Sequence, residues 1–255
     1  MALTHGELAR GTAAYTAAFI GLHVLCRALS RYSPAYSRLS PPDKAYWAAS
    51  MVSTVNAVAV ASIALQAFVT EPGMTALADD LYATVPQLES WGSFFLGYFV
   101  ADLLGNAYYW REWSGVEATT LHHAMGIIYF WQVLTGGFGH FHALCGWLLE
   151  ATTPFVNLRW FLAKAGWSGT PVYKANGCVL VLGWLALRIL FYGWALSQRA
   201  SMQVMQLDAA NAAIMYSGFA GGYLLQWFWG YKLLRGLLKA LGFIGKSSTR
   251  EAKAL

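Results

Sequence analysis

Charge is scarce in this chain of 255 residues, of which only 11% are Asp, Glu, Lys or Arg while 57% are hydrophobic. Soluble domains carry roughly 25% charged residues, and a soluble domain of this length could not bury so much apolar surface. The composition therefore excludes an ordinary soluble domain and predicts an integral membrane protein.

Cysteine is rare as well. The three cysteines, Cys26, Cys145 and Cys178, are odd in number, lie in or beside apolar runs and have no metal-ligand spacing. We interpret them as small hydrophobes buried in the membrane, which indicate little about the redox compartment. The sequence also lacks internal repeats and low-complexity segments, and this disfavours a transporter, because transporters commonly contain inverted repeats.

Seven apolar runs have about the length that a helix needs to cross a bilayer core of roughly 30 Å. They lack the period-2 alternation of barrel strands, and a backbone in lipid must pair its polar groups internally. We therefore predict an all-α fold, a polytopic membrane bundle of about seven transmembrane helices. The spans are expected at residues 9–29, 47–69, 91–110, 119–135, 140–162, 176–197 and 209–232, the fourth ending against Gly136, Gly137 and Gly139.

Charges in the connections predict the orientation of the bundle. The first connection is basic and the second acidic: Arg27, Arg31, Arg38 and Lys44 against Asp43 in the first, and Glu71, Asp79, Asp80 and Glu89 in the second. Basic loops stay in the cytosol, so the N-terminus should be luminal or exterior and the C-terminus cytosolic. The basic fifth connection and tail agree, whereas Arg111 is outnumbered by Glu112 and Glu117 in the third connection. The net charge of +5 is thus an orientation signal, and no basic stripe with stacked aromatics points to nucleic acid.

The first run is longer than the hydrophobic core of an ordinary signal peptide. The segment at its N-terminal end carries the acidic Glu7 as well as Arg10, and cations follow the run. We therefore expect a retained helix.

Polar residues inside the spans are candidates for function, because they are costly in lipid. In the third span, Tyr98, Asp102, Asn106 and Tyr109 follow one another at intervals of four, four and three, which places them on one helical face. This face should line an interior. Asp102 lies near mid-membrane and should be protonated or paired there.

The fifth and sixth spans contain further polar residues. Glu150, Pro154 and Asn157 follow one another at four and three, and Pro154 would clash with the carbonyl of Glu150, so a kink is expected. Arg188 lies midway through its apolar run, with no short path to water. By depth, Asp102, Glu150 and Arg188 could meet, either around a substrate or as an interhelical contact that only orients the bundle.

Two adjacent histidines, His122 and His123, stand at the start of the fourth span. Consecutive helical residues diverge by about 100°, so only one of them can point into a given pocket. That imidazole could act as a general base or accept an acyl group; alternatively, both rings bond to the backbone or to Glu117. Only His140 and His142 remain nearby, and they are expected at the opposite membrane face, so no metal site is predicted.

The order of four short motifs resembles a known family. Gly97-Tyr98-Phe99 and Asp102-Leu103-Leu104 come first, Leu121-His122-His123 follows, and Glu150 precedes the run Thr153-Pro154-Phe155-Val156-Asn157-Leu158-Arg159-Trp160-Phe161. This combination, over roughly residues 45 to 240, resembles the TLC-domain family of translocating-chain-associated, longevity-assurance and neuronal-lipofuscinosis proteins. The long run is especially similar to the non-ceramide-synthase branch, which is distantly related to ceramide synthases.

The resemblance implies a core of six helices with an added N-terminal helix, mainly in the endoplasmic reticulum. Residues 1–44 would then form an N-terminal transmembrane helix and basic cytosolic loop, residues 45–240 the TLC domain, and residues 241–255 a basic cytosolic tail. Ceramide synthases of this family condense acyl-CoA with a sphingoid-base amine, and their paired histidines map onto His122 and His123. Of the two carboxylates in their L-H-D-x-x-D element, only the first survives here, as Glu150, and the histidine and the second aspartate are absent. The middle of their motif is replaced by Gly136-Gly137-Phe138-Gly139.

Two functional hypotheses follow, both in lipid metabolism or lipid homeostasis. In the first, an acyltransferase uses His122 or His123 as base or acyl acceptor, Asp102 or Glu150 to orient it, and Arg188 or Asn157 to stabilise an oxyanion. In the second, the protein is a non-catalytic lipid-binding regulator of membrane phospholipid composition or lipid trafficking. A histidine that faces a cavity within reach of a carboxylate would favour the enzyme, and a buried, backbone-bonded pair the binder.

Both hypotheses place an acyl chain in an intramembrane cavity. The residues expected to bind it are Tyr98, Asn106, Tyr109, Asn157 and Arg188. The expected partners are membrane lipids, with acyl-CoA and a sphingoid base as substrates of an enzyme. No cofactor, metal or nucleic acid is expected, and a homodimer is left open.

Overall fold

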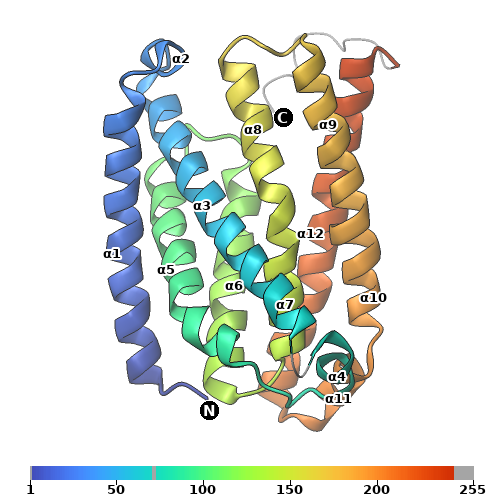
Figure 1. Ribbon diagram of the computed structural model, residues 1–255. Coiled ribbons are helices and arrows are strands. Elements are labelled where there is room, and N and C mark those ends of the chain that lie inside the picture. The colour runs from blue at the N-terminus through green and yellow to red at the C-terminus, as the bar shows by residue number, and fades with distance from the viewer. Residues whose placement is uncertain (1, 71–72, 244–255) are drawn as a thin grey trace.

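The computed structural model describes residues 2–70 and 73–243, and within these ranges it contains helices and no strands. The long helices stand side by side as one bundle, with α1 at its outer edge (Figure 1). The elements are α1 (His5–Ser30), α2 (Pro34–Ser37), α3 (Pro41–Val69), α4 (Gly73–Asp79), α5 (Pro86–Tyr108), α6 (Val116–Gly136), α7 (His140–Leu149), the 3₁₀ turn η1 (Glu150–Thr152), α8 (Thr153–Lys164), α9 (Pro171–Gly183), the π-helical η2 (Trp184–Phe191), α10 (Tyr192–Leu196), α11 (Arg199–Gln203), the 3₁₀ turn η3 (Val204–Gln206) and α12 (Ala209–Leu241). The all-α fold is confirmed.

Three helical segments are long and apolar enough to cross a bilayer: α1, α3 and the continuous segment Pro171–Leu196, which joins α9, η2 and α10. Each of the other predicted spans also coincides with helix, but the count of seven transmembrane helices remains a prediction. The predicted basic tail begins inside α12, and its residues 244–255 lie outside the described residues.

The connections lie at two ends of the bundle (Figure 1). The basic loop around α2 and the α8–α9 connection share one end, and α4 and α11 share the other. These connections therefore lie at alternate ends of the bundle, as the orientation predicted from charge assumes. The assignment of the α2 end to the cytosol is a prediction from charge alone.

Sequence signals explain where several helices begin and end. Thr4 and Glu7 form a capping box at the start of α1, and Ser40 caps α3 just before Pro41. The glycines after the fourth predicted span make the α6–α7 turn, in which Gly137 and Gly139 adopt positive φ values of 66° and 72°. A side chain at either position would be strained, so these glycines let α7 fold back along α6.

Besides η3, two segments of the described chain depart from regular α-helix. The 3₁₀ turn Glu150–Thr152 separates α7 from α8, whose second residue is Pro154, so the regular α-helix is interrupted where the kink was predicted. The π-helix Trp184–Phe191 contains Arg188 at its centre, and no sequence pattern indicated this π-helix. Both departures face the interior site described below.

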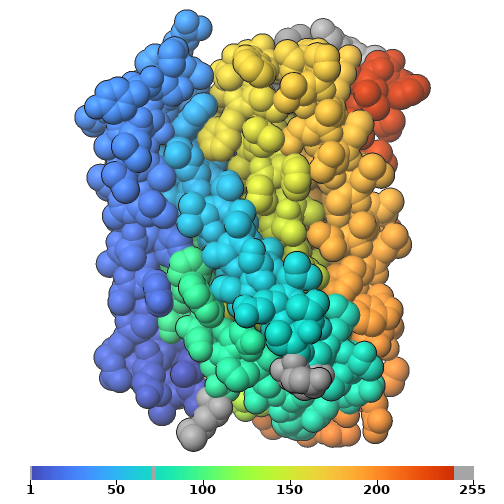
Figure 2. Space-filling model, viewed as in Figure 1, coloured from blue at the N-terminus to red at the C-terminus, as the bar shows by residue number. Residues whose placement is uncertain are grey.

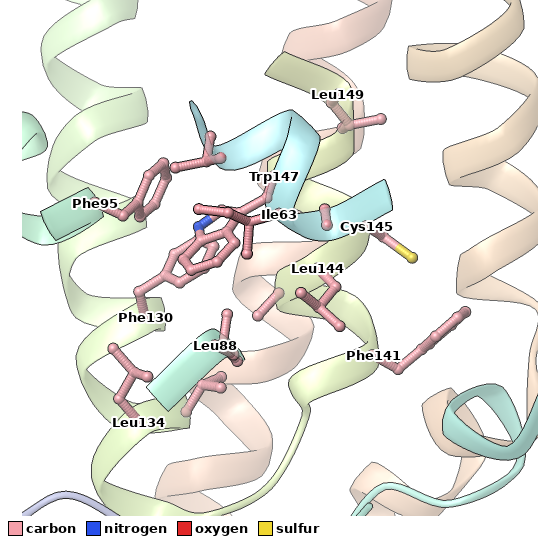
Figure 3. Packing of buried hydrophobic residues seen from close by; sticks show 14 of the residues in the cluster. Ile63, Leu88, Phe95, Phe130, Leu134, Phe141, Leu144, Cys145, Trp147 and Leu149 are labelled. Carbon is pink, nitrogen blue, oxygen red and sulfur yellow. The ribbon is translucent and has the colours of Figure 1, made fainter. Parts of the chain in front are cut away.

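The centre of the bundle is aromatic. Trp147 on α7 is fully buried and lies parallel to Phe130 on α6, with ring centroids 6.1 Å apart, while Phe95 on α5 packs 5.6 Å away (Figure 3). In front of this core, α3 runs obliquely across one face of the molecule (Figure 2). It contacts α1, α5, α7 and α8, and so ties both halves of the bundle together.

Helix α1 packs against α5 through a glycine. A Cβ added to Gly97 would lie 2.9 Å from the backbone nitrogen of Thr16 and would also collide with Tyr15, because the two backbones approach closely there. The hydroxyl of Thr16 also donates a hydrogen bond to the Gly97 carbonyl, at 3.3 Å. Small residues allow this kind of close contact in membranes.

We expect Gly97→Ala to lower the free energy of unfolding by about 1–3 kcal/mol, because neither backbone can yield without moving α1 from α5. Gly21→Ala is the matched control: Gly21 lies on the partner helix α1, with nothing near its added Cβ. Its substitution should be neutral or stabilising by about 0.5–1 kcal/mol. Unfolding of both variants in detergent micelles measures the difference, and equal stabilities would contradict the close packing.

Candidate functional site

A partly enclosed cavity of about 90 Å³ lies among α5, α6, α7, η1, η2, α10 and α12. Its polar end is formed by His122, Glu150, Arg188 and Gln226, and its walls are mainly aromatic and aliphatic. Glu150 and His142 both line it, although they stand eight residues apart along α7 and η1. Eight helical residues rise by about 12 Å, so the cavity is elongated along the bundle.

Arg188 organises the polar end. Its guanidinium donates hydrogen bonds to the hydroxyls of Thr152, at 2.7 Å, and Thr153, at 3.2 Å, and to the side-chain oxygen of Gln226, at 3.1 Å. It also stacks over the ring of Trp184, with 4.4 Å from Cζ to the ring centroid. These contacts satisfy a cation that is only 5% exposed.

Glu150 supplies the opposite charge. Its Oε1 lies 3.4 Å from a terminal nitrogen of Arg188, and its Oε2 accepts a hydrogen bond of 2.7 Å from the hydroxyl of Thr153. The 3₁₀ turn between α7 and α8 brings Glu150, Thr152 and Thr153 to the guanidinium together. The expected meeting of Glu150 and Arg188 is therefore found.

Asp102 does not join them. Its Oδ2 lies 3.1 Å from Nδ1 of His123 and accepts a hydrogen bond of 3.2 Å from the side chain of Asn106. The approach to His123 is an electrostatic contact, because the ring N–H is not aligned for a hydrogen bond. The expected triad is thus divided into a Glu150–Arg188 pair and an Asp102–His123 pair.

The two histidines diverge as consecutive helical residues must. His123 is buried and stacks on Phe99 at 4.5 Å, with Tyr98 edge-on to it at 5.9 Å. His122 lines the cavity, with the rings of Phe99 and Trp229 about it at 5.7 and 5.5 Å. Therefore His122 is the histidine that faces the cavity, whereas His123 is the one with a carboxylate partner.

Four of the five expected binding residues do not line the cavity, and only Arg188 does; the four are Tyr98, Asn106, Tyr109 and Asn157. Asn157 donates from its side chain to the carbonyl of Ser50, at 3.0 Å, and to the hydroxyl of Thr54, at 2.9 Å. It therefore ties α8 to α3. Tyr109 directly follows α5 and stacks on Trp113 at 4.8 Å.

Other site residues were not foreseen from the sequence. Gln226 is a polar residue within an apolar span, the same signal that singled out Arg188, and could have been found by it. Thr152 and Thr153 had no such signal, because threonine is common in helices whether or not they line a site. His142, expected at the opposite membrane face, reaches the same cavity as His122.

Comparison with known proteins adds to this geometry. The profile described as the TLC domain matches residues 46–235. The chain belongs to the TLC-domain family. In this TLC-domain chain, the matched range contains the two paired histidines as well as Glu150 and Arg188.

Three relatives illustrate the relationship. TLC domain-containing protein 4-A of Xenopus laevis is 27% identical over 237 residues, which are 89% of this chain and 90% of the relative. TLC domain-containing protein 4 of Homo sapiens is 23% identical over 233 residues, 88% of this chain and 86% of the relative. Protein CLN8 of Canis lupus familiaris is 28% identical over 194 residues, 69% of this chain and 64% of the relative. These are TLC proteins outside the ceramide synthases, as the resemblance implied.

We expect Arg188→Met to lower the free energy of unfolding by about 3–5 kcal/mol, because it leaves the Glu150 carboxylate buried without its cation. The double variant Arg188→Met with Glu150→Gln should lose clearly less than the sum of the two single variants. Unfolding of the three variants in micelles completes the cycle. Additive losses would show that the pair is not coupled.

Proposed function

We propose that this TLC-domain protein binds an acyl chain of a membrane lipid in the cavity and acts in lipid metabolism or lipid homeostasis. The observation that carries the proposal is one elongated cavity with apolar walls and a polar end at Arg188, Glu150 and Gln226. Its setting would be the endoplasmic reticulum membrane, with the N-terminus luminal and the C-terminus cytosolic.

Selectivity in such a cavity has to come from the polar end. Lipid tails are as apolar as the walls, so a chain gains little from the hydrophobic effect on leaving the bilayer. A few placed polar groups, in contrast, fix the orientation of a ligand in an otherwise apolar pocket. The Arg188–Glu150 pair is neutral as a unit, which favours an uncharged ester or amide carbonyl over a phosphate.

A chain can enter from the bilayer between α6 and α12. Met125 and Tyr129 of α6 lie against Gly221 and Gly218 of α12, where an added Cβ would meet their side chains. Methionine is flexible and repacks readily. Because about 90 Å³ holds only a short part of an acyl chain, the remainder would extend through this seam.

Acyl transfer is a second candidate, favoured by the position of His122 in the cavity wall beside the polar end. As a general base, its imidazole would take the proton of a lipid amine or hydroxyl while that nucleophile attacks the thioester carbonyl of acyl-CoA. The thiolate of CoA would leave and receive the proton, and an amide or ester would form. Gln226 and Arg188 are the donors nearest to a developing oxyanion.

We expect a leucine at position 146 to remove bound lipid. Gly146 lines the cavity, and an added Cβ would meet only Phe130, at 3.7 Å, so the larger side chain enters the free space. Acyl lipid that co-purifies with Gly146→Leu should fall about tenfold, as a conflict of about 1.4 kcal/mol would produce. Mass spectrometry of extracted lipid measures it.

Gly21→Leu is the control for this variant, because Gly21 is a helical glycine with open space around it. Gly222→Leu, on the opposite wall, provides a second obstruction, since its Cβ would lie 3.6 Å from the hydroxyl of Tyr192. Equal lipid content in the two obstructed variants and the control, all folded, would contradict the proposal.

If the protein transfers acyl groups, substitutions of the two histidines should lower turnover to different extents. With labelled acyl-CoA, a sphingoid base and other lipid acceptors, His122→Ala should lose turnover by about 10²-fold or more, the usual contribution of a general base. His123→Ala should retain part of the turnover, because His123 lies behind the wall and acts through packing. Product formation by purified protein is the measurement, and no product from lipid-loaded wild type would leave the binder as the function.

A further inference from the structure

The end of the cavity remote from Arg188 has its own unsatisfied polar groups. His142 is 2% exposed and lines the cavity, and its Nδ1 has no hydrogen-bond partner among the described residues. The hydroxyl of Tyr129, which also lines the cavity, is buried without a partner as well. Buried polar atoms are rarely left so, and each needs an explanation.

The hydrogen bonds of Ser201 indicate which role Nδ1 has. The hydroxyl of Ser201 lies 3.3 Å from the carbonyl of Ala195, to which it donates, and 2.7 Å from Nε2 of His142. A hydroxyl has one proton, and with that proton directed to the Ala195 carbonyl, Nε2 is the donor in the bond to Ser201. In the neutral ring, Nδ1 is then an acceptor, assigned here from the network.

Tyr129 lines the same cavity as His142 and shares an aromatic neighbour with it. The rings of Tyr129 and His142 both pack on Phe219, with centroid distances of 6.4 and 4.6 Å. The phenol can donate one hydrogen bond and accept others. Together, the two side chains offer one acceptor, Nδ1 of His142, and one donor, the phenol of Tyr129. A single hydroxyl group can donate to the first and accept from the second.

The surroundings disfavour other ligand groups. The remaining cavity residues near this end are Phe130, Gly146, Tyr192 and Gly218, and none of them carries a charge. A carboxylate or phosphate would therefore have no cation to meet it. Glu150 and Arg188 are about 12 Å away, by the rise of eight helical residues.

We propose that the His142–Tyr129 end is a hydroxyl-recognition subsite for an alkyl chain that carries a hydroxyl far from its polar head. The hydroxyl donates to Nδ1 of His142 and accepts from the phenol of Tyr129, while the carbonyl of the same molecule lies at the Arg188–Glu150 end. This subsite rests on the proposed binding of an acyl chain in the cavity, and names the chemical class of chain that binds best.

The test is a binding competition on the full chain in micelles. Saturated fatty acid methyl esters of increasing length, each paired with its ω-hydroxy derivative, compete with a radiolabelled parent ester. At one length the hydroxylated ester should bind about fivefold tighter than its parent, as one to two net hydrogen bonds allow. In Tyr129→Phe and His142→Phe this preference should fall to near unity, while the parent ester binds as before.

Tyr223→Phe is the matched control, because it also removes one hydroxyl from the bundle. That hydroxyl donates to the carbonyl of Ile189, at 3.1 Å, and Tyr223 does not line the cavity. The control should keep the full preference for the hydroxylated ester. If His142→Phe does not fold, Tyr129→Phe alone tests the subsite, because it removes only one oxygen atom that has no partner.

The outcomes separate the two proposals. If parent and hydroxylated esters bind equally at every length, the subsite is wrong, and water fills that end of the cavity, while lipid binding stands. If no ester binds, and Gly146→Leu changes nothing, the proposed function itself fails. A preference that persists in both Tyr129→Phe and His142→Phe would place hydroxyl recognition elsewhere and overturn the inference.

Discussion

The burial of Arg188 is the constraint on which the rest of the structure depends. Removing a guanidinium from water costs several kcal/mol unless its donors are met and its charge is offset. Here η1 supplies Glu150 and one threonine hydroxyl, the start of α8 supplies a second, α12 supplies Gln226, and the π-helix carries Trp184 beneath the guanidinium. The irregular segments η1 and η2 therefore meet at the same cation, and the cavity lies beside them.

The divergence of His122 and His123 links a rigid contact to this cavity. His123 is held between Asp102 and Phe99, which fastens α6 to α5. Phe99 also contacts His122 and lines the cavity. The Asp102–His123 pair therefore positions the wall from which His122 faces the ligand, although neither member of the pair reaches the cavity.

Sequence patterns predicted what depends on local rules. Hydropathy located the helices, Pro154 located the interruption of regular α-helix, and the 100° step between neighbours predicted that only one of His122 and His123 would enter a pocket. The partner of Asp102 was not predictable, because depth in the membrane does not fix the rotation of a helix about its axis. The π-helix around Arg188 could not be predicted for a related reason: it depends on tertiary contacts with Thr152 and Gln226.

The partners of Glu150 bear on the choice between binder and enzyme. In a catalytic triad a carboxylate orients the general base, and the carboxylate that lines the cavity with His122 is Glu150, which Arg188 and Thr153 already hold. Asp102 contacts His123 instead. Without rearrangement, His122 faces the cavity with no carboxylate bonded to it among the described residues, and this arrangement suits binding. Catalysis would require an incoming carbonyl to take hydrogen bonds from Arg188, so that Glu150 is released toward His122 at the moment the substrate is in place.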